Sequence, residues 1–147
     1  MAVRRVTRKA SKGDPFTVRF DRETQRAIEE EARRTRRTRT ALVEELVDEA
    51  LRTHRFPGIG FRDSFPRRRA WLTGAGVDVW ELCELVDRYP NVKTLLADFP
   101  HIHQLHLDLA LAYREEYAEE IGEQLAENDR SPEDWRRLAP FARDARR

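Results

Sequence analysis

A short stretch of alternating apolar and polar residues, 15–21, comes directly before two short helical segments, and this order limits what the chain can fold into. Successive side chains of a strand point to opposite sides, so an alternation of period two predicts a strand with one buried face. A strand of this length is stable only when it pairs with another strand. Its apolar face holds Phe16, Val18 and Phe20, and its polar face holds Thr17 and Arg19.

Two short helices are predicted to follow the strand. Asp21 is placed to cap the first helix, which is expected to run to about Arg34 with acidic residues in its first turn. The second helix begins at Thr38 after a polar stretch. Its apolar residues recur at helical spacing and are Leu42, Val43, Leu46, Val47, Ala50 and Leu51.

One strand and two helices of this size do not close a hydrophobic core by themselves. The simplest source of a partner strand is a second copy of the chain, which predicts a dimer with an intermolecular two-stranded ribbon. The outer face of such a ribbon carries Thr17 and Arg19 from each copy, and a two-stranded ribbon fits the major groove of DNA. We expect the dimer core to contain Phe16, Val18, Phe20, Ile28, Leu42, Val43, Leu46 and Val47.

The same segment, with Thr38-Arg39-Thr40-Ala41-Leu42-Val43 opening the second helix, resembles the ribbon-helix-helix family of Arc- and MetJ-like repressors. The resemblance covers residues 15–54 and implies that Thr17 and Arg19 read bases. It also implies that the start of the second helix, at Thr38, holds a phosphate. We expect phosphate contacts from side chains around this point and in the N-terminal arm, namely Arg5, Arg8, Arg36, Arg37, Thr38, Arg39 and Thr40.

The turn between the two helices departs from that family. The family usually has Gly followed by an apolar residue at this point, and this chain has Arg36 and Arg37. An arginine raises the cost of a left-handed turn, which favours a turn built in another way. The extra positive charge suits contact with phosphate. The alternative, an amphipathic helical hairpin with an isolated strand, leaves Arg19 and this cluster of arginines unexplained.

Charge is sorted along the chain, although the net charge of the whole is only +1. The net charge is +5 over residues 1–55, −7 over 56–129 and +3 over 130–147. A basic front and an acidic middle predict contact with a polyanion at the front and with a different partner behind it. We therefore divide the chain into a basic arm (1–13), a DNA-binding and dimerisation domain (14–55), a second domain (56–128) and an Arg-rich tail (129–147).

The second domain is predicted to combine a β-hairpin with several helices. A breaker region over 54–60, which contains Pro57, Gly58 and Gly60, marks its start. Alternating residues predict two strands, 59–62 and 69–72. Helices are expected from Asp78 to about Tyr89, from Val92 to Ala97, from His103 to Glu116, and around Ile121 and Leu125.

Several motifs of this domain, among them Asp98-Phe99-Pro100-His101-Ile102 and Ala110-Leu111-Ala112-Tyr113, are similar to a helix-turn-helix-like domain found in VapB-type antitoxins. That resemblance implies a toxin as a protein partner. A helix-turn-helix shape also suggests a second contact with DNA. The helix that would enter the groove carries Asp108, Glu115 and Glu116, and acidic groups are repelled by phosphate. We therefore favour dimerisation or partner binding for this domain.

The tail combines positive charge with large aromatic side chains, and we expect it to bind the protein partner. An arginine can pair with acidic groups of a nuclease-type metal site, and aromatic side chains dominate many protein interfaces. The alternative is that the aromatic side chains pack on the chain's own helices. The residues predicted to bind the partner are Trp135, Arg136, Arg137, Phe141 and Arg143.

The sequence has no Gly-rich phosphate loop, no Gly-x-Ser-x-Gly and no His-Glu-x-x-His, so we expect neither an enzyme nor a bound cofactor. His101, His103 and His106 are close in sequence, but they have no Cys nearby and lack the spacing of a metal site, so no metal is predicted. Cys83 is expected to be a buried apolar residue. No apolar run reaches membrane length, which predicts a soluble, cytoplasmic protein without membrane contact.

These features together predict a mainly α dimer with an N-terminal ribbon-helix-helix domain and a C-terminal helical domain that includes a β-hairpin. The predicted function is sequence-specific repression at an inverted-repeat operator in double-stranded DNA. The two resemblances imply a VapB-type antitoxin that represses its own operon and neutralises a toxin. The alternatives are a stand-alone ribbon-helix-helix transcription factor without a toxin and, from another class, the regulatory part of an enzyme system.

Overall fold

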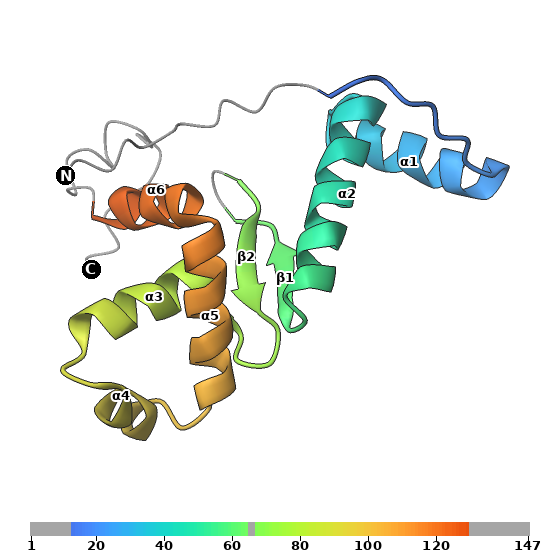
Figure 1. Ribbon diagram of the computed structural model, residues 1–147. Helices are drawn as coiled ribbons and strands as arrows, with labels where there is room; N and C mark the ends of the chain where they lie inside the picture. The colour runs from blue at the N-terminus through green and yellow to red at the C-terminus, as the bar shows by residue number, and fades with distance from the viewer. Residues whose placement is uncertain (1–12, 65–66, 130–147) are drawn as a thin grey trace, which may run out of the picture. The chain divides into compact units, whose positions relative to one another are not determined.

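Helices account for most of the computed structural model, which describes residues 13–64 and 67–129 (Figure 1). A small three-stranded antiparallel sheet accompanies them. The predicted mainly α fold is therefore confirmed at this level. The chain divides into two compact units between Glu44 and Glu45. None of the helices in the described ranges combines the length and apolar character that a membrane span requires.

The first unit contains α1 (Arg22–Arg34) and the start of α2 (Arg39–Arg55). Asp21 caps α1 as predicted, because its carboxylate accepts hydrogen bonds from the Thr24 N–H at 2.7 Å and from the Thr24 hydroxyl at 3.0 Å. These hydrogen bonds lower the pKa of Asp21. Thr38 caps α2 in the same way, since its Oγ1 accepts from the Ala41 N–H at 3.1 Å.

The turn between α1 and α2 is left-handed, and the prediction of a different turn is wrong. Arg36 adopts a φ of 54°, a conformation that favours glycine. The Arg37 N–H donates to the Ala32 carbonyl at 2.9 Å, and the Arg36 N–H donates to the Arg33 carbonyl at 3.2 Å. These two bonds form a Schellman motif and satisfy carbonyls that the end of the helix would otherwise leave unpaired. The gain from these bonds outweighs the backbone cost of placing an arginine there.

The sheet of the second unit consists of β1 (Ile59–Arg62), β2 (Arg69–Leu72) and β3 (Val77–Asp78), in that order. The predicted hairpin of β1 and β2 is confirmed, with Ile59 opposite Leu72. The third strand was not predicted. A turn with Gly76 at a φ of 71° returns the chain beside β2, where Trp71 pairs with Asp78.

Four helices follow the sheet: α3 (Val79–Arg88), α4 (Val92–Asp98), α5 (Gln104–Glu116) and α6 (Ala118–Asn128). All four were predicted near these bounds. Asp78 begins α3 with a capping box in which the Glu81 carboxylate accepts from the Asp78 N–H at 2.8 Å. Asn91 begins α4, since its side chain accepts from the Thr94 N–H at 2.9 Å.

The core of the second unit lies where α3 meets β2, α5 and α6. Tyr113 is the largest fully buried side chain in it. Its ring contacts Phe56 edge to face, with ring centroids 5.4 Å apart. The core residues are Phe56, Ile59, Ala70, Leu72, Val79, Trp80, Leu82, Cys83, Leu95, Ile102, Leu107, Ala110, Tyr113 and Ile121.

Three arginine side chains connect the C-terminal half of α2 to the rest of the second unit. Arg52 donates to Glu120 at 2.6 Å, and Arg55 lies 2.8 Å from Glu116. Arg68 donates to both carboxylate oxygens of Glu49, at 2.7 and 3.1 Å. The C-terminal half of α2 is therefore bonded to α5, α6 and the sheet, and it belongs to the second unit.

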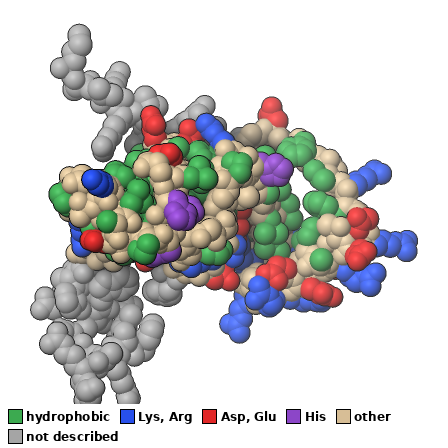
Figure 2. Space-filling view, turned by 90° about the horizontal axis from the view of Figure 1, so that it is seen from below, with side chains coloured by type: hydrophobic (Ala, Val, Ile, Leu, Met, Phe, Trp, Pro, Cys, Tyr) green, Lys and Arg blue, Asp and Glu red, His purple; other side chains and the backbone are tan. Residues whose placement is uncertain are grey.

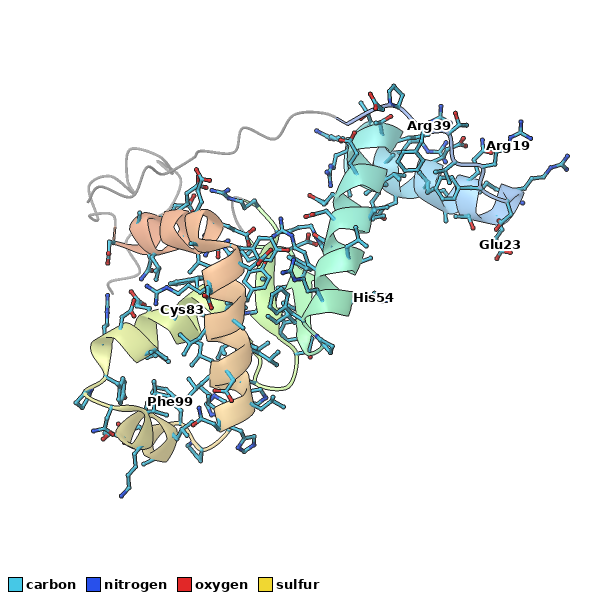
Figure 3. The ribbon with its side chains drawn as sticks, viewed as in Figure 1. Arg19, Glu23, Arg39, His54, Cys83 and Phe99 are labelled. Carbon is cyan, nitrogen blue, oxygen red and sulfur yellow. The ribbon has the colours of Figure 1, made fainter. Side chains whose placement is uncertain are left out.

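Cys83 is fully buried within α3, as predicted (Figure 3). Burial raises its pKa to about 11, so at about pH 8 the thiol is almost entirely protonated and unreactive. We expect a thiol reagent to leave the folded protein unmodified at this pH and to modify it fully after unfolding in guanidinium chloride. Because the chain has a single cysteine, the absorbance of the group that the thiol reagent releases measures the reaction of this residue alone. Rapid labelling of the folded protein would contradict the buried position.

Candidate nucleic-acid interface

Residues 13–21 precede α1 in the sequence and form no strand in the single chain. A strand is defined by its pairing, and the predicted partner belongs to a second copy, so the ribbon stays a prediction. The three apolar side chains of the predicted strand are uncovered: Phe16 is 85% exposed, Val18 54% and Phe20 44%. Large apolar side chains exposed in a row commonly mark an interaction site.

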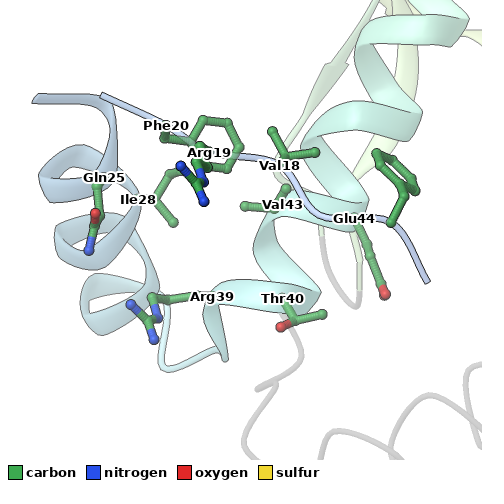
Figure 4. Close-up of a pocket in the computed structure, with 10 residues that line it drawn as sticks. Val18, Arg19, Phe20, Gln25, Ile28, Arg39, Thr40, Val43 and Glu44 are labelled. Carbon is green, nitrogen blue, oxygen red and sulfur yellow. The ribbon is translucent and has the colours of Figure 1, made fainter. Parts of the chain in front are cut away.

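These side chains line a cavity of about 630 Å³ in the first unit (Figure 4). Ile28 of α1 and Val43 of α2 provide the apolar wall opposite the extended segment. The polar lining residues are Arg19, Gln25, Arg39, Thr40 and Glu44. An open cavity with an apolar wall on each side is suited to receive further apolar side chains.

Leu42 is the one residue of the predicted dimer core that is buried in the single chain. Ile28 and Val43 are half-buried, and the remaining five are exposed. Leu46 and Val47 follow Val43 by three and four residues, so the three share one face of α2.

The two predicted base-reading residues are both exposed, but one of them, Arg19, is not separated from the apolar side chains. Arg19 lines the same cavity as Val18 and Phe20. Opposite faces arise from the pleat of a paired strand, and residues 13–21 have no strand pairing in the single chain. The predicted separation of Thr17 and Arg19 from the apolar face therefore depends on the second copy.

Around the start of α2, some of the residues predicted to bind phosphate already form hydrogen bonds within the chain. Arg39 (Figure 3) donates to Glu29 at 3.1 Å, and Arg37 donates to the Ala41 carbonyl at 3.1 Å. Thr38 is occupied as a cap, and Thr40 is exposed. The N–H groups of the first helical residues have no acceptor within the helix. Figure 2 shows Lys and Arg side chains next to Asp and Glu side chains at the right of the view.

A second cavity of about 430 Å³, which includes Arg39 at the start of α2, is lined largely by arginines. Arg36, Arg37 and Arg39 were predicted to contact phosphate, whereas Arg33 was not singled out. The signal was available, since Arg33 lies three and four residues before Arg36 and Arg37. The remaining lining residues are Glu29 and Ala32.

Two of the three histidines around the start of α5, His103 and His106, have a structural explanation. The Nδ1 of His106 accepts a hydrogen bond from the His103 N–H at 3.0 Å, and the two rings stack. Burial and then the neighbouring His103 and His101 lower the pKa of His106. No group of three potential metal ligands occurs among the described residues. His106 therefore closes the helix end, a role that sequence reasoning missed.

The outer face of α5 mixes acidic and apolar side chains. Leu105 is 65% exposed, and Leu111, Asp108 and Glu115 are also exposed. The apolar pair was missed because both residues lie off the buried stripe of α5. This composition does not suit phosphate, and it fits contact with a protein better than contact with DNA.

Several predicted site residues lie outside the described part of the chain. They are Arg5 and Arg8 of the arm and Trp135, Arg136, Arg137, Phe141 and Arg143 of the tail. Their roles stay predictions.

Comparison of the chain with protein-family models, curated proteins and solved structures finds no match. Its function is therefore inferred from its own residues.

Proposed function

We propose that the chain is a dimeric, sequence-specific DNA-binding protein of the ribbon-helix-helix type that represses transcription. The observation that carries the proposal is the uncovered apolar row of Phe16, Val18 and Phe20, placed before two helices that are joined by an arginine-containing turn. This row needs a cover, and pairing with the same row of a second copy supplies both the cover and the missing strand partner.

In this proposal, the two strands form an antiparallel ribbon that enters the major groove. Pairing imposes the pleat, which turns the apolar residues toward the four helices and Thr17 and Arg19 toward the bases. The guanidinium of Arg19 can donate two hydrogen bonds to the O6 and N7 of guanine. The two-fold symmetry of the dimer requires an inverted repeat in the operator.

The start of α2 positions the dimer on the DNA backbone. Its first N–H groups point out of the helix end and carry partial positive charge, which favours a phosphate. Thr38 holds the chain in the geometry that exposes them. Such contacts do not depend on base sequence, so they fix the register while the ribbon supplies specificity.

We assign the second unit to a protein partner. Its described part is acidic, and α5 exposes Leu105 and Leu111 beside Asp108. Together with the antitoxin-like motifs, this supports an antitoxin of the VapB type whose partner is a toxin encoded beside it. Co-purification with the product of the neighbouring gene tests this assignment. A dimer that binds DNA but no neighbouring product would be a stand-alone repressor.

Arg19→Ala is expected to relax sequence preference without abolishing binding. Removal of a bidentate contact to guanine costs about 1–3 kcal/mol of discrimination against other bases. The measurement is the affinity for a site selected from a random library by the unaltered protein, compared with the affinity for unselected DNA. Arg26→Ala, an exposed arginine of α1, is the matched control and should keep the preference. Equal losses on selected and unselected DNA in the Arg19 variant would contradict base reading.

A further inference from the structure

Arg36 combines a strained backbone with a side chain that forms no hydrogen bond or ion pair with the described residues. Its φ of 54° lies in the region that glycine occupies more easily. The hydrogen bonds of the turn come from backbone groups, so glycine would make the same turn with less strain. The side chain is exposed and has no carboxylate partner within residues 13–64 and 67–129. Strained residues of this kind often serve a function other than stability.

The Arg36 side chain lines the Arg-rich cavity of about 430 Å³. Two of the four arginines there are already engaged, since Arg39 pairs with Glu29 at 3.1 Å and Arg37 donates to the Ala41 carbonyl. Arg33 and Arg36 remain, and neither has a carboxylate partner among the described residues. The pairing of Arg39 with Glu29 also neutralises the single acid of the cavity.

We propose that Arg33 and Arg36 form an anion site that holds one phosphate of the DNA backbone. This inference rests on the proposed DNA binding and adds to it a contact separate from the base-reading ribbon. Two unpaired guanidinium groups beside one cavity repel each other until an anion lies between them. Each guanidinium can donate two parallel hydrogen bonds to phosphate oxygens. The retained arginine at a glycine-type position is then explained by binding.

The test uses random-sequence duplex DNA, because a phosphate contact does not depend on base sequence and needs no known operator. Arg36→Gly and Arg33→Ala in the full chain should weaken binding several-fold at low salt. Each should also reduce the slope of log affinity against log salt by about one. Arg26→Ala lies outside the cavity and should keep the original slope. Arg36→Gly should also raise the denaturant midpoint, because the strain is removed while the hydrogen bonds of the turn remain.

The outcomes separate this inference from the proposed function. If the unaltered protein binds DNA and both variants keep its salt slope, the anion site is wrong and DNA binding stands. If the unaltered protein binds no DNA, the proposed function fails and the inference fails with it. A third outcome is that inorganic phosphate stabilises the unaltered protein but not Arg36→Gly, while the salt slopes of DNA binding are equal for the two proteins. The cavity would then bind free phosphate, and the proposed contact with the DNA backbone would be overturned. The proposal is supported if Arg36→Gly raises the stability of the protein and lowers its affinity for DNA.

Discussion

Arg52→Ala is expected to lower the free energy of unfolding of the second unit by about 2–4 kcal/mol, because it leaves part-buried polar groups without their partner. The guanidinium donates to Glu120 at 2.6 Å and to the Tyr113 hydroxyl at 2.8 Å, and it lies 4.2 Å from the Tyr117 ring centroid. Its Nε lies 2.9 Å from Asp48 without the alignment of a hydrogen bond. Burial alone would lower the pKa of Arg52, but the bonds to Glu120 and Tyr113 raise it.

Arg55→Ala is the matched control, because Arg55 is the next arginine on α2 and also pairs with a glutamate. Both side chains of the Arg55–Glu116 pair are well exposed, so the control should cost no more than about 1 kcal/mol. Urea unfolding of both variants measures the difference. A double-mutant cycle with Glu120→Ala isolates the pair itself. Equal costs for Arg52 and Arg55 would show that the buried network contributes little.

Elements set by neighbouring residues were predictable from the sequence. Asp21 and Asp78 are side chains suited to capping a helix, and each begins a helix where expected. The hairpin of β1 and β2 follows from local alternation in the same way. Capping and periodicity act over three or four residues, so the sequence alone contains the information.

The features that were missed depend on residues far apart in sequence or on competition between opposing free-energy contributions. The connection of α2 to α6 depends on bonds such as that from Arg52 to Glu120, which are 68 residues apart. The third strand has only two residues, too few for a pattern. Arg36 was expected to avoid a left-handed turn because of its local cost, but two backbone bonds to carbonyls of α1 decide the turn.

The residues of the candidate DNA-binding site could be predicted from the sequence, but their arrangement is incomplete in a single chain. The identity of the apolar row followed from alternation, and its exposure agrees with a surface that is covered by something else. The face that Arg19 occupies did not follow in the same way, because residues 13–21 are unpaired in the single chain and pairing with a second strand would hold their side chains on alternate sides. The spacing of Arg33 before Arg36 and Arg37 could be read from the sequence, but the cavity that they line depends on the turn between α1 and α2.

Val18→Asp and Val47→Asp are each expected to abolish dimerisation and, with it, tight DNA binding. Val18 lies in the exposed row and Val47 on the exposed face of α2, and we propose that the partner copy covers both. An unpaired carboxylate buried there costs several kcal/mol, and about 3 kcal/mol already weakens the dimer more than a hundredfold. Sedimentation at low micromolar concentration, combined with DNA binding, measures the effect.

Val92→Asp is the matched control for these two changes. Val92 is 38% exposed, against 51% for Val47, but it lies on α4, outside the proposed interface. A general effect of placing a charge on an exposed valine would appear in all three variants. Loss of the dimer in the Val18 and Val47 variants alone would locate the interface on the strand and α2. If all three remain dimeric and bind DNA as the unaltered chain does, the apolar row is not the dimer interface, and a ribbon formed by two copies cannot be the DNA-reading element.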